Sequence, residues 1–255
     1  MPGLKGLQNR LLAALPEGIY GRLREHLEDV TLTAGEVAYE AWHPVTHVYF
    51  PHDAIVSLGH ALRDGRTVAI AMVGNEGMLG AGLLLGATAS PYRALVQNTG
   101  RASRVTVDAM RAQFARGGPL EYLVLRYTQA LLAQVAQTAV CNRHHSVEQQ
   151  LCRWLLMTAD RGPGDLLTST HELISSLLGV RREGITEAAN RLQKARLIQY
   201  NRGRILLRDR EALEARACEC YRVVRQEFDR LLPPAPPPLS DSKPRRDAPA
   251  KGRRD

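Results

Sequence analysis

The 255-residue sequence lacks an apolar run of membrane-spanning length, and it has only four cysteines. A span needs about 18 consecutive apolar residues, and no stretch comes near that length. The N-terminus also lacks the basic segment, followed by an apolar one, that is typical of a secretory signal. Four cysteines without regular spacing are typical of reduced thiols rather than of a disulfide framework. We therefore expect a cytoplasmic protein with no membrane partner.

The chain also lacks the residue groupings on which catalysis depends. No carboxylate pair, no nucleophile beside a base and no phosphate-binding glycine loop stands out, so we do not expect an enzyme. Positive charge is what the chain has in excess: 34 Lys and Arg against 26 Asp and Glu, a formal net charge of +8. Residues 181–210 hold nine basic and three acidic residues. Such a concentrated basic excess indicates a polyanionic partner.

Residues 29–108 consist of short β-prone segments separated by Gly, Pro and Asp-Gly. Strands at intervals of roughly ten residues are typical of a β-barrel or double-sheet jelly roll. Asp64-Gly65 predicts a hairpin turn, because glycine tolerates the positive φ of a tight turn. Apolar residues at helical spacing predict two short helices before the strands, over 7–15 and 19–27. The strands are expected at 30–33, 36–40, 46–50, 54–62, 67–73, 94–98 and 103–107.

After Pro119 the chain has no glycine until Gly162, and its pattern becomes helical. The spacing predicts one long helix followed by a shorter one over 147–157. One stripe of the long helix consists of Leu120, Leu123, Tyr127, Leu131 and Gln134. Because a stripe of this length needs a partner, we predict that it packs against the same helix of a second subunit.

The segment from Leu167 to Asp209 carries the most informative pattern. Thr170 can cap a helix, Gly179 can end it, and a second helix is expected over about 181–196. Ser175 is small where the two helices would cross, a spacing typical of a helix-turn-helix.

Three further features of this segment fit the same motif. Ile185 would anchor the second helix, with Ala188, Ala189 and Leu192 on its buried face. Two β-prone segments, 197–200 and 204–207, predict a hairpin that would form the wing of a winged helix. The alternative interpretation is a plain helical hairpin with solvated arginines.

This segment resembles the DNA-binding domain of the Crp/Fnr family of bacterial transcription regulators. The resemblance extends over residues 1–220 in the order of the parts. It implies an α+β fold with a cyclic-nucleotide-binding-like barrel or jelly roll (1–118), a dimerisation helix (119–145) and a winged helix-turn-helix (146–220). The proline-rich basic tail, 233–255, is expected to be disordered, because it has too few apolar residues to fold.

The resemblance implies a sequence-specific transcription regulator, a homodimer that binds a palindromic site in double-stranded DNA. An activator of this kind would also contact RNA polymerase. Arg182 and Glu183 occupy the place of the family's base-reading pair. Arginine can donate two hydrogen bonds to guanine, and glutamate can accept one from cytosine. Glu187 stands where the best-known member has another arginine, which changes the expected target sequence. Phosphate contacts are expected from Thr170, His171, Arg181, Arg202 and Arg204.

The resemblance also implies a ligand site in the barrel, at Gly80, Ala81, Gly82 and Arg93. There, backbone N–H groups would face a phosphate and the arginine would neutralise it. Ala81 stands where members that bind cyclic AMP carry a glutamate, so cyclic AMP is disfavoured as the effector. Two alternatives remain: the barrel binds another small molecule, or it binds none and serves only as a dimer scaffold. No cofactor is predicted. The glycines can equally form a tight turn, and Arg93 an exposed charge.

Histidines and cysteines raise the question of a metal. His43, His47 and His52, near Glu40, suggest a cupin-like metal-binding enzyme with an accessory nucleic-acid domain, which is the alternative function. We favour the interpretation that they are ordinary polar residues of the barrel. Prolines between them interrupt the alternation of side chains that would place all three on one face of a strand.

The cysteines give a second grouping. Cys141, His144, His145 and Cys152 crowd the junction of two helices, where a metal or thiol switch is an alternative to a plain hinge. In Cys218-Glu219-Cys220 a helix would turn the two thiols apart. We predict no metal ligand in either group.

Overall fold

The computed structural model describes residues 9–61, 67–162 and 164–232. The hairpin turn expected at Asp64-Gly65 and the tail 233–255 lie outside these described residues.

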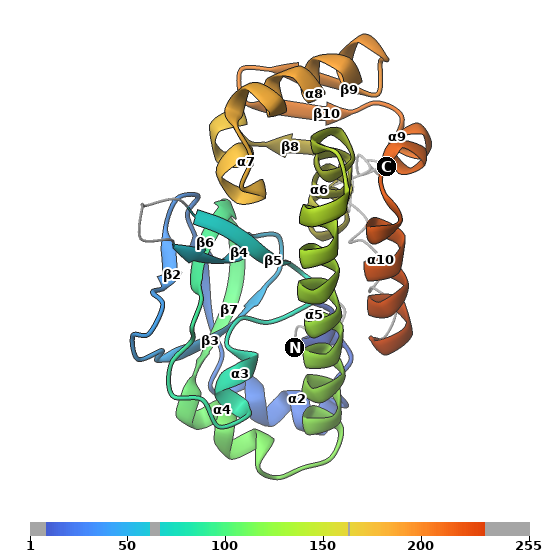
Figure 1. Cartoon of the computed structure of the whole chain (residues 1–255). Coiled ribbons are helices and arrows are strands. Elements are labelled where there is room, and N and C mark those ends of the chain that lie inside the picture. The colour runs from blue at the N-terminus through green and yellow to red at the C-terminus, as the bar shows by residue number, and fades with distance from the viewer. Residues whose placement is uncertain (1–8, 62–66, 163, 233–255) are drawn as a thin grey trace, which may run out of the picture.

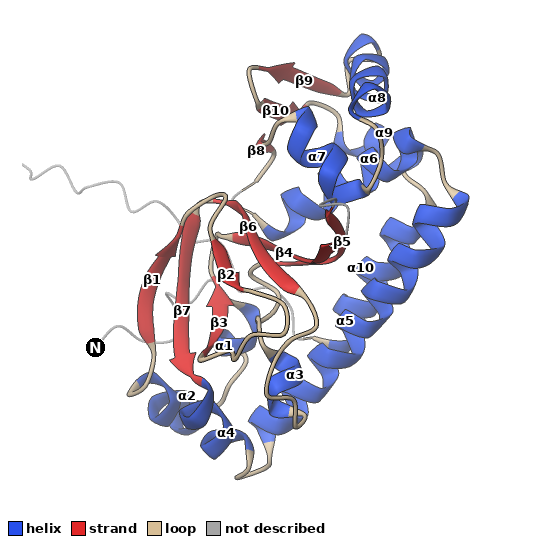
Figure 2. Cartoon of the chain, turned by 60° about the vertical axis from the view of Figure 1, so that its left-hand side comes forward, coloured by secondary structure: helices blue, strands red, loops and turns tan. Residues whose placement is uncertain are grey.

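The N-terminal part consists of two antiparallel sheets flanked by short helices (Figures 1 and 2). The three-stranded sheet has the order β1-β7-β3, and the four-stranded sheet has the order β2-β6-β4-β5. The strands are β1 (Glu28–Leu32), β2 (Val37–Tyr39), β3 (His47–Pro51), β4 (Ile55–Ala61), β5 (Thr67–Val73), β6 (Arg93–Asn98) and β7 (Gly100–Thr106). The predicted strands and the double-sheet architecture are confirmed, although the two sheets do not close into one barrel.

Four helices flank these sheets. They are α1 (Arg10–Ala13), α2 (Glu17–Arg24), α3 (Ala81–Leu84) and α4 (Val107–Phe114). In β6 the exposure alternates as a pleated strand requires: Ala94 and Val96 are buried, while Arg93 and Leu95 are half-buried. The sequence pattern did not predict α4.

The long helix α5 (Pro119–His144) runs past the sheets, and α10 (Glu219–Leu231) packs along it (Figures 1 and 2). Proline is favoured at the first position of a helix, where its missing N–H is not needed. Tyr127 is completely buried, and its hydroxyl donates a hydrogen bond of 3.0 Å to the carbonyl of Met78. The helix is therefore fixed to the β-sheet part within one chain.

The stripe that we expected at a subunit interface is covered by its own chain. Leu120, Leu123, Tyr127 and Gln134 are at most 8% exposed, and Leu131 is partly buried. The prediction that this face meets a second subunit is wrong, because β5 and α10 occupy it. No element was predicted for residues 219–231, which form the helix that covers the stripe.

The C-terminal part has a small sheet of order β8-β10-β9 with helices around it (Figure 1). Helix α6 begins with a reciprocal capping box between Ser146 and Gln149, which satisfies two N–H groups that would otherwise lack partners. The elements are α6 (Val147–Arg161), β8 (Leu166–Thr168), α7 (His171–Leu178), α8 (Arg182–Lys194), β9 (Ile198–Asn201), β10 (Arg204–Leu207) and α9 (Arg210–Arg216). The expected helix over 147–157 is confirmed, whereas β8 and α9 were not predicted.

A buried polar network joins the two parts. Arg161 of α6 donates a 2.7 Å hydrogen bond from Nε to Glu76 Oε1 and a 2.8 Å bond from Nη2 to Gln134 Oε1. The amide of Gln134 in turn donates to the carbonyl of Met72 at 3.0 Å. The network includes residues of β5, of the loop after it, of α5 and of α6, so it holds the C-terminal part against the sheets.

Candidate nucleic-acid interface

Helices α7 and α8 form the helix-turn-helix that the spacing predicted. The Thr170 hydroxyl caps α7 by accepting a 3.1 Å hydrogen bond from the backbone N–H of Leu173. Gly179 ends α7 in the left-handed region, at φ 69°, where a side chain would be strained. Ser175 is buried at 6% exposure. Thr170, Gly179 and Ser175 thus have the roles in the helix-turn-helix that the sequence predicted.

Helix α8 buries one face and presents the other to solvent. Ile185, Ala188, Ala189 and Leu192 are at most 6% exposed, as expected. The exposed residues at its start are the N-cap Arg181 and, within the helix, Arg182, Glu183 and Glu187. Charged side chains at the start of this helix are therefore free of the protein core.

Arg182 makes one ion pair, with Glu172 of α7, at 3.7 Å between Nε and Oε2. The side chains are 66% and 73% exposed, and exposed pairs of this kind contribute little stability. The guanidinium can therefore exchange this carboxylate for a base edge at little cost.

The wing is a two-residue hairpin between β9 and β10. Arg202 and Gly203 at its tip have φ of 46° and 79°, and two positive φ values are typical of a type I′ turn. Asn201 pairs with Arg204 across the turn. Arg202 and Arg204 are both exposed, so the wing carries two cations beside α8.

His171 is placed differently from the other expected DNA contacts, because it is half-buried between α7, α8 and the wing. Its ring stacks on Tyr200 with 4.3 Å between centroids, and Nδ1 lies 3.0 Å from Thr186 Oγ1. Burial, with the nearby charge of Arg182, lowers the pKa of His171. The stacked imidazole therefore joins the wing to the helices, and its lowered pKa disfavours a charged contact with a phosphate.

Gly80, Ala81 and Gly82 line a cavity at the start of α3, in the sheet part. Gly80 has φ of 91°, which favours glycine. The fourth expected ligand residue, Arg93, is not part of this lining, and its Nε lies 3.3 Å from Glu40 Oε1. The remaining lining consists largely of apolar or small side chains: Tyr39, Val45, Leu58, Met78, Leu83, Ala87, Ala89, Ser90, Pro91, Tyr92 and Leu131.

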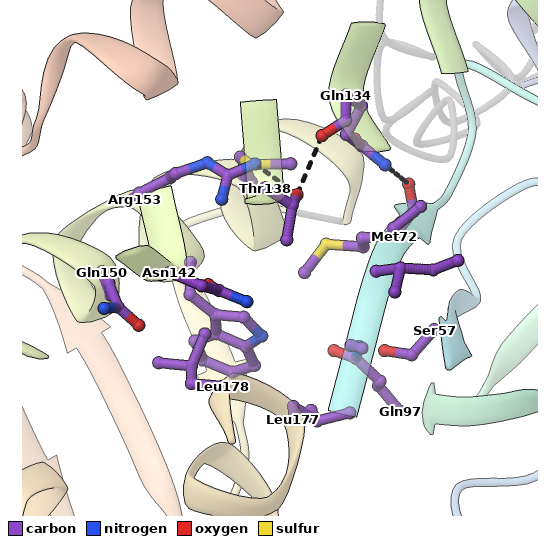
Figure 3. A pocket seen from close by; sticks show the side chains of 15 residues that line it. Ser57, Met72, Gln97, Gln134, Thr138, Asn142, Gln150, Arg153, Leu177 and Leu178 are labelled. Atoms are coloured by element: carbon purple, nitrogen blue, oxygen red, sulfur yellow. Dashed lines mark hydrogen bonds between the residues drawn. The ribbon is translucent and has the colours of Figure 1, made fainter. Parts of the chain in front are cut away.

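A second cavity lies between the sheets and the C-terminal part (Figure 3). Ser57 and Gln97 face it from the sheet side, and Arg153 faces it from the opposite side. The Ser57 hydroxyl, both amide atoms of Gln97 and Arg153 Nε are buried without a hydrogen-bond partner in the protein, as is Trp154 Nε1. Buried polar atoms usually have partners, so these atoms leave hydrogen-bonding capacity that water or a polar ligand can satisfy. No pattern in the sequence predicted this cavity.

Metal-ligating side chains gather at one place in the described ranges. Cys141, His145, Cys218 and Cys220 form the group of three or more close ligands found there. Cys152 is buried elsewhere and His144 is exposed. His43, His47 and His52 form no such group; His47 Nδ1 lies 2.9 Å from Thr46 Oγ1, and His52 Nε2 2.9 Å from Ser103 Oγ. The geometry gives the cupin-like alternative no support.

Across the described part of the chain, the helices are all too short or too polar to traverse a lipid bilayer.

The double-sheet part, the long helix and the winged helix-turn-helix define a DNA-binding regulator. Residues 149–216 match the model of the Crp-like helix-turn-helix domain. No curated protein matches the sequence. The chain thus contains a Crp-like helix-turn-helix domain, and its fold is similar to that of solved Crp/Fnr transcription regulators.

Solved structures with the same fold share little sequence with the chain. FixK2 from Bradyrhizobium japonicum is 16% identical with a TM-score of 0.63, covering 75% of this chain and 98% of that one. A CRP-family transcriptional regulator from Thermus thermophilus is 22% identical, with a TM-score of 0.61 and coverages of 74% and 96%. The c-di-GMP responsive global regulator CLP of Xanthomonas campestris is 16% identical, with a TM-score of 0.60 and coverages of 75% and 99%.

Proposed function

We propose that the protein regulates transcription in the cytoplasm as a homodimer whose two α8 helices bind a palindromic DNA site. The exposure of Arg182 and Glu183 at the start of α8 carries this proposal. Their helix is held by a buried face, so the pair projects from a rigid support. Two-fold symmetry would set the half-sites about one helical turn, roughly 10 bp, apart.

The exposed side chains divide into base readers and phosphate contacts. Arg182 would donate to guanine O6 and N7, and Glu183 would accept from cytosine N4; Glu187 lies one turn further along. The contacts that fix the register on the backbone would come from Thr170, Arg181, Arg202 and Arg204. In an activator, a further surface would contact RNA polymerase.

A second face of α5 supports the dimer. Alternating steps of three and four residues along this face are typical of a coiled-coil seam. Leu132 and Tyr122 are 61% and 60% exposed in the single chain, and Leu125 is 45% exposed. We define this face as the α5 seam, made of Tyr122, Leu125, Gln129, Leu132, Ala136 and Ala139. It lies on the side of α5 that its own chain leaves uncovered.

Two arginine substitutions test the assigned DNA roles. Arg182→Ala should reduce discrimination against a changed guanine by about 1–3 kcal/mol. Arg202→Ala should weaken binding to all sequences and lower the salt slope by about one unit. Mobility shifts on a selected site and its point variants, at several salt concentrations, measure both effects.

Arg22→Ala, an exposed substitution on α2, is the control for this experiment and should change neither quantity. Equal losses on every DNA sequence from Arg182→Ala and Arg202→Ala would contradict the division into base reader and phosphate contact.

We also propose that a small polar effector binds in the cavity between the sheets and the C-terminal part, rather than beneath α3. The cavity beneath α3 has few polar groups, and Arg93 is engaged by Glu40. The cavity between the sheets and the C-terminal part is lined by β4, β5 and β6 on one side and by α5, α6 and α7 on the other. A ligand there touches both parts, so it can favour one of their arrangements if its affinities for them differ.

Gln97→Leu tests this effector site. Native mass spectrometry of the untagged full chain should show a bound small molecule that Gln97→Leu loses and Ala81→Val, a substitution beneath α3, retains. The reverse pattern would contradict the proposal. The proposal would also be contradicted if the wild type carried no ligand and Gln97→Leu had a higher melting temperature than the wild type. In a cavity without a ligand, removing buried polar atoms that lack partners increases stability.

A further inference from the structure

Four metal-ligating side chains meet where α5 ends and α10 begins. Cys141 and His145 lie one helical turn apart at the end of α5, and Cys218 and Cys220 lie at the start of α10. Their ligand atoms are all within 4.8 Å of one another, and the three cysteines are buried. Two segments that are distant in the sequence thus contribute two ligands each.

The distances fit a single tetrahedral ion. Zinc binds cysteine sulfur at about 2.3 Å and histidine nitrogen at about 2.0–2.1 Å, so tetrahedral neighbours lie about 3.8 Å (S–S) and about 3.5 Å (S–N) apart. Cys141 Sγ is 3.6 Å from Cys218 Sγ, and Cys220 Sγ is 3.4 Å from His145 Nδ1. An iron–sulfur cluster would need wider spacing, because its thiolates bind different irons.

The local backbone explains how a Cys-x-Cys pair converges here. Cys218 is the N-cap of α10 with φ −72° and ψ 162°, so it precedes the helix in extended conformation. Only Cys220 is helical, and the expectation that a helix turns the two thiols apart is wrong. On α5, a spacing of four residues places Cys141 and His145 on the same face.

The surrounding groups orient the ligands. His145 directs Nδ1 to the thiols, and its Nε2 lies 3.3 Å from Glu219 Oε1. Metal-bound histidines usually have such a carboxylate on the other ring nitrogen. Gln137 Nε2 donates a 3.1 Å hydrogen bond to Cys220 Sγ. The positive charge of Arg153 acts on Cys141 and would offset the negative charge of a three-thiolate site.

We propose that Cys141, His145, Cys218 and Cys220 bind one Zn²⁺ ion. Four protein ligands leave no open position, so the site is structural rather than catalytic. The ion would tie the end of α5 to α10 beside the turn at His145 and Ser146 that leads into the DNA-binding domain. It would thereby fix the start of α10 against the end of α5.

Metal analysis of the full chain tests the site directly. Protein purified without a tag under reducing conditions should contain one zinc per chain. Co²⁺ in place of zinc should give the intense visible bands of tetrahedral thiolate coordination. Cys141→Ala and Cys220→Ala should lose the metal, while Cys152→Ala, which removes the cysteine outside the group, should retain it. Circular dichroism checks that each variant folds.

Glu219→Gln keeps the test decisive where a cysteine variant does not fold. It leaves all four ligands and should lower zinc affinity about 10–100-fold in chelator competition, as loss of an orienting partner does. An unchanged affinity would contradict the assigned geometry. The proposal would be overturned if folded, reduced wild type took up neither zinc nor cobalt, or if it held iron and sulfide instead. It would also be overturned if Cys152→Ala lost the metal to the same extent as Cys141→Ala.

Discussion

Replacing Leu132 with glutamate should convert the proposed dimer into a monomer and remove specific DNA binding. Leu132 lies in the middle of the α5 seam and is 61% exposed in the single chain. In a two-fold coiled coil the introduced carboxylates of the two subunits would be buried close together, where neither has a partner. A monomer binds one half-site, so specific affinity should fall at least about 10³-fold, toward the non-specific level.

Sedimentation velocity and mobility shift measure the two effects of Leu132→Glu. Leu85→Glu is the matched control, because Leu85 is 50% exposed and lies at the end of α3, away from the seam. It should leave both the dimer and DNA binding unchanged. A dimer that survives Leu132→Glu would contradict the seam, as would dissociation caused by Leu85→Glu.

The sequence predicted the parts whose signals are local. Strands were recognised because turn residues bound short β-prone segments, and the helix-turn-helix because Thr170, Ser175 and Gly179 each act within a few residues of their own positions. The wing followed from two short apolar segments around Arg202 and Gly203. The confirmed elements are those in which neighbouring residues determine the backbone.

The partner of each helix face could not be predicted in the same way. Apolar residues surround much of α5, and periodicity cannot tell which stripe meets which neighbour. The stripe through Tyr127 was assigned to a second subunit, although α10 and the sheets cover it. The α5 seam contains Gln129, Ala136 and Ala139, which are weak hydrophobic signals. Only the tertiary arrangement distinguishes the two faces.

The cysteine group shows the same limit. Cys141 and Cys218 are 77 positions apart, and the spacing within each pair says nothing about the distance between the pairs. Arg93 was expected to face a phosphate, but the position of Glu40 beside it depends on how β2 pairs with β6. Residue type suggested the chemistry at both places, and only the fold shows which groups come together.

Glu76→Gln should be among the most destabilising single substitutions in the protein. Glu76 and Arg161 are 5% and 7% exposed, with 2.7 Å between Arg161 Nε and Glu76 Oε1. Glutamine keeps the shape but removes the charge, which leaves the Arg161 guanidinium buried without its anionic partner. Breaking a buried pair in this way costs about 3–5 kcal/mol. Urea unfolding, followed by fluorescence and circular dichroism, measures the loss.

The double variant Glu76→Leu with Arg161→Leu separates the cost of a lone charge from the net value of the pair. Replacing both partners of a buried ion pair by apolar residues is often neutral or stabilising. Here Gln134 Oε1 would lose its bond from Arg161 and the Gly74 N–H its bond to Glu76, at a cost of about 1–3 kcal/mol for each unpaired buried group, which removal of the buried pair itself partly offsets. The double variant should therefore unfold at a higher urea concentration than Glu76→Gln. If Glu76→Gln cost less than the double variant, the guanidinium would have found water or another partner, and the network would not hold the two parts together through this charge.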